Sequence, residues 1–143
     1  MYAGYLQQNY DDPGFSDVSG AAYGGQIEWY PSLLTTVRVN ARRSIEETIL
    51  VGNSSYTVTS ANIGIDHELL RNVILSADAF YERDNFNGTT RRDTVFGIAL
   101  TGAYRVNRNI EFDLGYTYTR RDTNVAGLGY PNNIFRLGII GRI

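Results

Sequence analysis

Hydrophobic and polar residues alternate along most of the chain with a period of two, which is typical of β-strands. The segment 96–106 shows this most clearly, because its even-numbered residues are mostly apolar and its odd-numbered residues are small or polar. Only in the first predicted segment, at residues 2–10, is it unclear which positions belong to the apolar face. The alternation predicts eight strands, at about residues 2–10, 23–29, 37–42, 61–69, 73–82, 96–106, 110–119 and 135–143.

The connections between these segments alternate in length. Short ones are expected near residues 31–32, 70–72 and 107–109, and long polar ones at 11–20, 46–55, 84–92 and 122–132. An even number of strands with short turns at one end and long loops at the other is typical of outer-membrane barrels. We therefore predict a single all-β domain over residues 1–143, an eight-stranded antiparallel up-and-down transmembrane β-barrel with both termini in the periplasm.

The alternation alone also fits a soluble eight-stranded ligand-binding barrel with an apolar interior. Three features favour a barrel in the bacterial outer membrane. The polar face carries charges of both signs, which can pair in a narrow lumen. The chain has no lysine, which soluble barrels usually carry on exposed edges. Aromatic residues gather toward the strand ends on the apolar face, and we expect an interfacial girdle of Trp29, Tyr81, Phe96, Tyr104, Phe112 and Tyr118.

Composition excludes several classes of site. The 143 residues include no Cys and one His, so disulfides, thiolate nucleophiles and cysteine or histidine metal clusters are not expected. The net charge of −2 argues against a basic nucleic-acid-binding face. No apolar run approaches the roughly 20 residues of a membrane-spanning helix. We expect no cofactor, no nucleic-acid partner and no catalysis.

The short turn at 107–109 fixes one strand register. It places Arg105 opposite Glu111 on the polar face and Tyr104 opposite Phe112 on the apolar face. If the lumen is dry, removing one member of the Arg105–Glu111 pair would cost on the order of 3–5 kcal/mol.

Several motifs resemble a known family. They are the segments from Asp66 to Asn72, Tyr104 to Asn109, Gly115 to Asn124 and Tyr130 to Asn133. The earlier segments from Tyr10 to Pro13 and from Trp29 to Pro31 belong to the same set. They look like the C-terminal part of the bacterial outer-membrane "putative beta-barrel porin type 2" proteins, and the likeness covers nearly the whole chain.

The resemblance implies an outer-membrane barrel and, loosely, a link to exopolysaccharide export. Members are usually much longer barrels, so this chain would match their last eight strands. The terminal aromatic residue that the barrel-assembly machinery recognises in such proteins is replaced by Ile143. Because Met1 directly precedes the first strand, we expect a mature or shortened chain.

Charged residues on the polar face form the first candidate site. We expect a lumen network of ion pairs in which acids and arginines nearly balance. It comprises Arg38, Arg42, Asp66, Glu68, Asp78, Arg105, Glu111, Asp113, Arg121 and Arg136, with Arg142 as a further candidate. A selectivity lining and glycosidase-like carboxylates are the alternatives. Because eight strands enclose a space that side chains just fill, the monomer is expected to have no open channel.

The apolar face carries two further candidates. His67 lies beside a short turn, and we interpret it as an interfacial histidine, because a lipid A-modifying enzyme would need a neighbouring Ser or Asp. Arg43, Arg83 and Arg120 follow the apolar series at the long-loop end of their strands, where they either contact lipopolysaccharide or are ordinary exposed arginines. The expected function is thus a porin-like or scaffold barrel, monomeric, with the lipid bilayer or detergent, lipopolysaccharide and the barrel-assembly machinery as partners.

Overall fold

The computed structural model describes residues 1–9, 11, 17–48 and 55–142, and these residues form eight antiparallel strands. None of them lies in a helix long and apolar enough to cross a membrane. The strands are β1 (Tyr2–Gln8), β2 (Val18–Ser32), β3 (Thr35–Glu47), β4 (Ser55–Leu70), β5 (Val73–Phe86), β6 (Arg92–Arg105), β7 (Ile110–Thr123) and β8 (Tyr130–Gly141).

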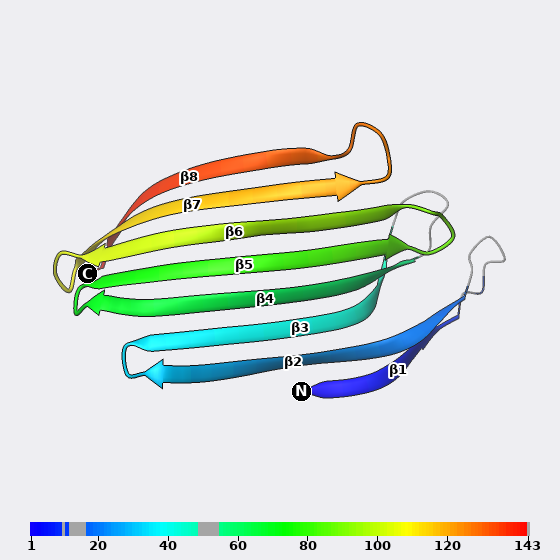
Figure 1. Ribbon diagram of the computed structural model, residues 1–143, viewed down its shortest axis with the longest axis horizontal. Coiled ribbons are helices and arrows are strands. Elements are labelled where there is room, and N and C mark those ends of the chain that lie inside the picture. Colours follow the sequence, from blue (N-terminus) through cyan, green and yellow to red (C-terminus); the bar gives the residue numbers. More distant parts are fainter. Residues whose placement is uncertain (10, 12–16, 49–54, 143) are drawn as a thin grey trace.

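Each strand pairs with the next one along the chain, so the sheet order is β1 to β8 without a crossover (Figure 1). This confirms the predicted all-β, eight-stranded antiparallel up-and-down fold. Tight turns connect the strands at one end. In the turn after β6, the Asn107 side-chain Oδ1 accepts hydrogen bonds from the backbone N–H groups of Asn109 and Ile110, at 2.8 and 3.0 Å. Such a turn fixes the register of the two strands that it joins.

Most strands are longer than the alternation predicted. β2 continues through Pro31 and Ser32, so the first short turn lies at Leu33 and Leu34 rather than at 31–32. β5 and β8 also extend into segments predicted as loops. Beyond the apolar band both faces of the strands are polar. The strands therefore stay hydrogen-bonded to each other in a region where the sequence no longer alternates between apolar and polar residues. Three residues of the motif from Tyr10 to Pro13, most of the loop at 46–55 and the terminal Ile143 fall outside the described residues.

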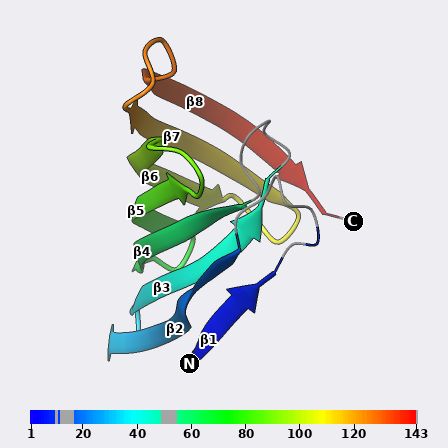
Figure 2. The same ribbon diagram turned by 90° about the vertical axis from the view of Figure 1, so that its right-hand side faces the viewer.

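The sheet has one polar and one apolar face. We call the face that carries Arg38 and Asp78 the inner face, and the face that carries Ile65 and Leu100 the outer face. On the inner face, Arg38, Gly64 and Asp78 are Cα partners across β3, β4 and β5. On the outer face, Val37, Ile65 and Ala77 are Cα partners across the same three strands. Along β6 from Phe96 to Thr101, outer residues are exposed and inner residues are less so. The sheet curls as a whole (Figure 2), and the lower exposure of the polar side chains is expected on the inside of such a curl.

The two edges of the sheet are not joined to each other. Among the described residues β1 pairs only with β2, and β8 only with β7. A single row of Cα partners runs from Tyr2 through every strand to Tyr130. These are the first residues of β1 and β8, so the edge strands overlap only in this row. Such stagger is what a sheet acquires when its strands tilt around a barrel axis.

Candidate functional site: the charged inner face

The register brings the predicted lumen residues to one face of the sheet. All ten members of the proposed network lie on the inner face, which is the face of Arg38. Phe80 shares this face, although the sequence pattern gave it no role. Its ring covers Gly97 on β6, where a Cβ atom would lie only 2.6 Å from the Phe80 ring. Glycine is therefore required at position 97 for this contact.

Only part of the predicted network is paired. Arg38 Nη1 lies 2.5 Å from Asp66 Oδ2, and Arg105 Nε lies 2.9 Å from Glu111 Oε2. Arg42 and Arg121 have partners that were not predicted, which are Glu46 and Asp93. Within the described chain no ion pair engages the remaining four members, Glu68, Asp78, Asp113 and Arg136.

The register predicted from the turn at 107–109 is correct, whereas the Arg105 side of the pair is more exposed in this open sheet than a dry lumen would leave it. Arg105 is the Cα partner of Glu111, and Tyr104 is that of Phe112. Arg142 Nη2 also approaches the Glu111 carboxylate, at 3.6 Å. However, the Arg105 side chain is 48% exposed. An ion pair this open is worth about 0.2–1 kcal/mol, well below the value expected for a dry lumen.

The best-buried charged group lies at the long-loop end of the inner face. Asp93, on β6, is 1% exposed. Its Oδ2 accepts hydrogen bonds from Arg91 Nη2 at 2.7 Å and Arg121 Nη2 at 2.5 Å. The Arg91 guanidinium also lies 4.5 Å from the centre of the Phe86 ring, which stacks on Tyr56. Through these two hydrogen bonds, Asp93 on β6 links Arg91 in the loop that follows β5 with Arg121 on β7.

By length, Asp93 is expected to lie beyond the part of β6 that crosses the membrane. A tilted strand spans the bilayer in about 9–11 residues, and counted from the short-turn end of β6 this length is reached at Val95. Burial opposes ionisation of the Asp93 carboxyl, but hydrogen bonds from Arg91, Thr123 and Arg121 outweigh it and lower its pKa to about 2. Sequence reasoning missed this residue because it directly follows a segment predicted as a loop. Asp93 and Val95 do continue the inner-face series of β6, which was the available signal.

Asp84 gives a pH-dependent prediction. It is the Cα partner of Asp93 and also lies past the spanning part of its strand. Burial raises the pKa of Asp84 to about 6, and the charges of Glu82 and Asp93 add to the shift. Because the folded-state pKa is above the ordinary value of 3.8, ionisation of Asp84 destabilises the fold above pH 6 and not below pH 4. D84N is expected to raise the free energy of unfolding by about 1–3 kcal/mol at pH 8. Urea titrations in detergent at pH 8 and pH 4 test this, and an equal effect at both pH values would contradict it.

His67 lies on the outer face near the turn between β4 and β5. Its Nδ1 is 2.9 Å from Thr35 Oγ1, and Leu75 is its Cα partner. In the part of the chain that the structure describes, no three His, Cys, Asp or Glu side chains gather as a metal site.

The outer-face arginines do not form one level. Arg43 and Arg83 share a row, since both are Cα partners of Thr59. Arg120 lies one outer-face row nearer the short turns, opposite Phe96, and its Nε is 2.9 Å from Asp122 Oδ1.

The six aromatic residues predicted for the girdle all project from the outer face, with Tyr81 opposite Phe96 and Tyr104 opposite Phe112 at the two ends of β6. Their position at the bilayer interfaces stays a prediction.

Comparisons with known proteins agree with this architecture. A family model described as "Putative beta-barrel porin 2" matches residues 1–142. No curated protein matches the chain. Among solved structures, the chain is similar to OmpT, an outer membrane protein of Vibrio cholerae in its trimer form, with a TM-score of 0.66 and 12% sequence identity. The alignment covers 96% of this chain and 48% of that one, so this chain spans about half the length of the solved protein.

Proposed function

Since the chain belongs to the family of beta-barrel porins whose model matches residues 1–142, and lies in the bacterial outer membrane, we propose that its eight strands form part of the wall of a barrel wider than eight strands. In this proposal the charged inner face lines a water-filled path for polar solutes. The outer-membrane location sets aside the soluble ligand-binding barrel that the alternation alone also allowed.

The unpaired edges of the sheet carry this proposal. In hydrocarbon each unsatisfied backbone N–H or C=O group costs several kcal/mol, so an open edge does not persist there. Among the described residues β1 and β8 each have one free edge. Further strands that pair with both edges would widen the barrel, and the likeness to about half of a longer outer-membrane protein supports this arrangement.

Pairing of β1 with β8 is the alternative and would give the narrow, side-chain-filled barrel predicted from the sequence. Planar-bilayer recording with the full-length protein separates the two. The wider barrel is expected to give a steady conductance of porin size. A folded, inserted protein with no conductance would support the narrow scaffold barrel instead.

Transport of a saccharide polymer is a more specific form of the proposal. The inner face has uncharged hydrogen-bonding groups beside its charges, such as Asn40 Nδ2, which donates to Asn62 Oδ1 at 3.1 Å, and the hydroxyl of the exposed residue Tyr30, which donates to Glu28 Oε2 at 2.5 Å. Such groups bind hydroxyl-rich solutes. Reversible block of the current by added oligosaccharides would support an export role. A current that added oligosaccharides leave unchanged would favour a path for small ions instead.

We expect the path to prefer cations, because acids outnumber arginines on the inner face of the described strands. A lining of fixed negative charge favours cations over anions. The acids are Glu28, Glu46, Asp66, Glu68, Asp78, Glu82, Asp84, Asp93, Glu111 and Asp113, and the arginines are Arg38, Arg42, Arg105, Arg121, Arg136 and Arg142.

The reversal potential across a KCl gradient measures this preference. The double variant E68Q/D78N removes two acids that have no ion-pair partner, so the preference for K⁺ should fall while the fold stays intact. D122N, which removes an acid from the outer face, is the matched control and should leave the reversal potential unchanged. Anion preference in the parent protein would contradict the proposal.

Two further roles belong to the proposal. We expect Arg43 and Arg83 to contact lipopolysaccharide phosphates, whereas the Arg120 guanidinium already donates to Asp122. Catalysis is not part of the proposal. A lipid A-modifying activity at His67 would need an acid or a serine beside the ring, and the hydrogen-bond partner that the structure describes for it is the Thr35 hydroxyl. Insertion by the barrel-assembly machinery is the expected route into the membrane.

A further inference from the structure

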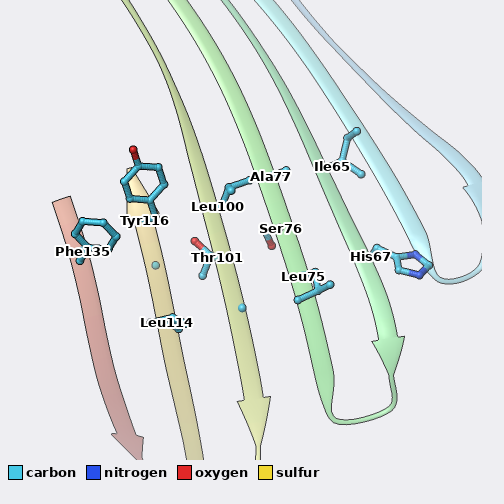
Figure 3. A pocket seen from close by; sticks show the side chains of 12 residues that line it. Ile65, His67, Leu75, Ser76, Ala77, Leu100, Thr101, Leu114, Tyr116 and Phe135 are labelled. Atoms are coloured by element: carbon cyan, nitrogen blue, oxygen red, sulfur yellow. The ribbon is translucent and has the colours of Figure 1, made fainter. Parts of the chain in front are cut away.

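A groove with a volume of 630 Å³ crosses the outer face from β4 to β8 (Figure 3). Gly102 forms its floor, between its Cα partners Leu75 and Leu114. A Cβ atom at Gly102 would lie 3.6 Å from Leu75 Cδ2, so the missing side chain leaves open space above the backbone. The remaining outer-face lining residues are Ile65, His67, Ala77, Leu100, Tyr116 and Phe135.

The lining offers almost no polar contact. His67 contributes the ionisable side chain at the β4 end, where Thr35 holds it by the hydrogen bond described above. At the other end the Tyr116 ring packs against Phe135 with ring centres 4.9 Å apart, and its hydroxyl donates to Asn133 Oδ1. An elongated apolar molecule fits this groove, whereas a polar solute would find few partners inside it.

The groove lies nearer the short-turn end of the strands. Leu75 is close to the start of β5, and Gly102 is close to the end of β6. In outer-membrane barrels the short turns face the periplasm. The groove is therefore at the depth of the periplasmic leaflet, where phospholipid chains surround the protein.

We infer that this groove binds one acyl chain of a periplasmic-leaflet phospholipid. The groove is continuous with the apolar face that contacts the membrane, and in hydrocarbon an unfilled hollow would deprive its lining of dispersion contacts. A flexible acyl chain can follow the groove across the strands and fill it. His67 at the rim is placed to donate a hydrogen bond to the glycerol or phosphate oxygens of the same lipid.

Two alanines on one strand give a matched test. Ala77 lines the groove, and Ala79 lies two residues further along the same outer face but outside it. A77L fills part of the groove, A79L adds the same bulk elsewhere, and G102L blocks the floor. Each variant is refolded with phosphatidylethanolamine and phosphatidylglycerol, its fold is checked by heat-modifiable gel migration, and bound phospholipid is counted by native mass spectrometry.

The parent and A79L are expected to retain one phospholipid, and A77L and G102L to bind it at least tenfold more weakly. A parent that retains no phospholipid, or equal retention in the folded A77L and A79L variants, would overturn the inference. Dimers of the parent that are lost in A77L but not in A79L would also overturn it, because the groove would then be an interface between two copies. If G102L does not fold, the A77L and A79L pair alone decides the outcome.

Discussion

Arginine in place of Leu100 is expected to lower the free energy of unfolding by about 2–4 kcal/mol, the cost of a charge at the lipid-facing midplane of a barrel. Leu100 lies near the middle of the apolar band of β6 and projects from the outer face. A guanidinium there must either leave water or distort the bilayer around it. Equilibrium unfolding in urea with phospholipid vesicles measures the change.

The neighbouring residue supplies the control. Ala99 projects from the inner face, where its Cα partner on β5 is Asp78, an acid without an ion pair in the described chain. A99R is therefore expected to change stability by less than about 1 kcal/mol, since the new charge stays in water beside an opposite charge. Equal destabilisation by L100R and A99R, or a larger loss in A99R, would show that the faces are assigned the wrong way round.

Removal of the Asp93 carboxylate is expected to cost about 3–5 kcal/mol, because it leaves the Arg91 and Arg121 guanidinium groups without their shared buried partner. D122N is the matched control, since the Arg120–Asp122 pair is 53% exposed on both sides and is worth at most about 1 kcal/mol. Thermal unfolding of D93N and D122N in detergent compares the two losses.

The effect of D93N should also depend on pH in a defined direction. The folded-state pKa of Asp93 is lowered to about 2 from 3.8, so its stabilising contribution is complete above about pH 4 and is lost as the pH falls through 2. The difference between the parent and D93N is therefore expected to be full at pH 7 and to shrink at pH 2. A difference that stays constant across this range would show that Asp93 acts by packing rather than by charge.

Alternation was sufficient to predict the strands and the two faces, because one face of each strand must meet hydrocarbon. It also gave the register of β6 and β7, since a short turn leaves little freedom in how Arg105 and Glu111 align. It failed at the strand ends, where Pro31 and Asp93 lie in β-structure that was predicted as turn or as the border of a loop. There both faces are polar and the period of two disappears from the sequence.

The pairing of the inner-face charges could not be predicted from the sequence in the same way. Which acid an arginine meets depends on residues that are 28 positions apart in the chain, as for Arg121 and Asp93, and on the register of the two neighbouring strands that carry them. The outer-face groove also depends on three strands at once, because Gly102 opens a hollow only where Leu75 and Leu114 border it. A local pattern cannot contain such information.

The single tryptophan allows the most direct test of the central claim, that the apolar face of this sheet lies in the membrane and the charged face lines the interior. Trp29 projects from the outer face of β2 near the first short turn, and Tyr30 beside it projects from the inner face. Trp29 fluorescence is expected to be quenched by phospholipids brominated near the headgroup and to be little affected by aqueous iodide. In the variant W29F/Y30W the tryptophan moves to the inner face, and iodide should quench it while brominated lipid should not. Quenching of Trp29 by iodide but not by brominated phospholipid would contradict the account.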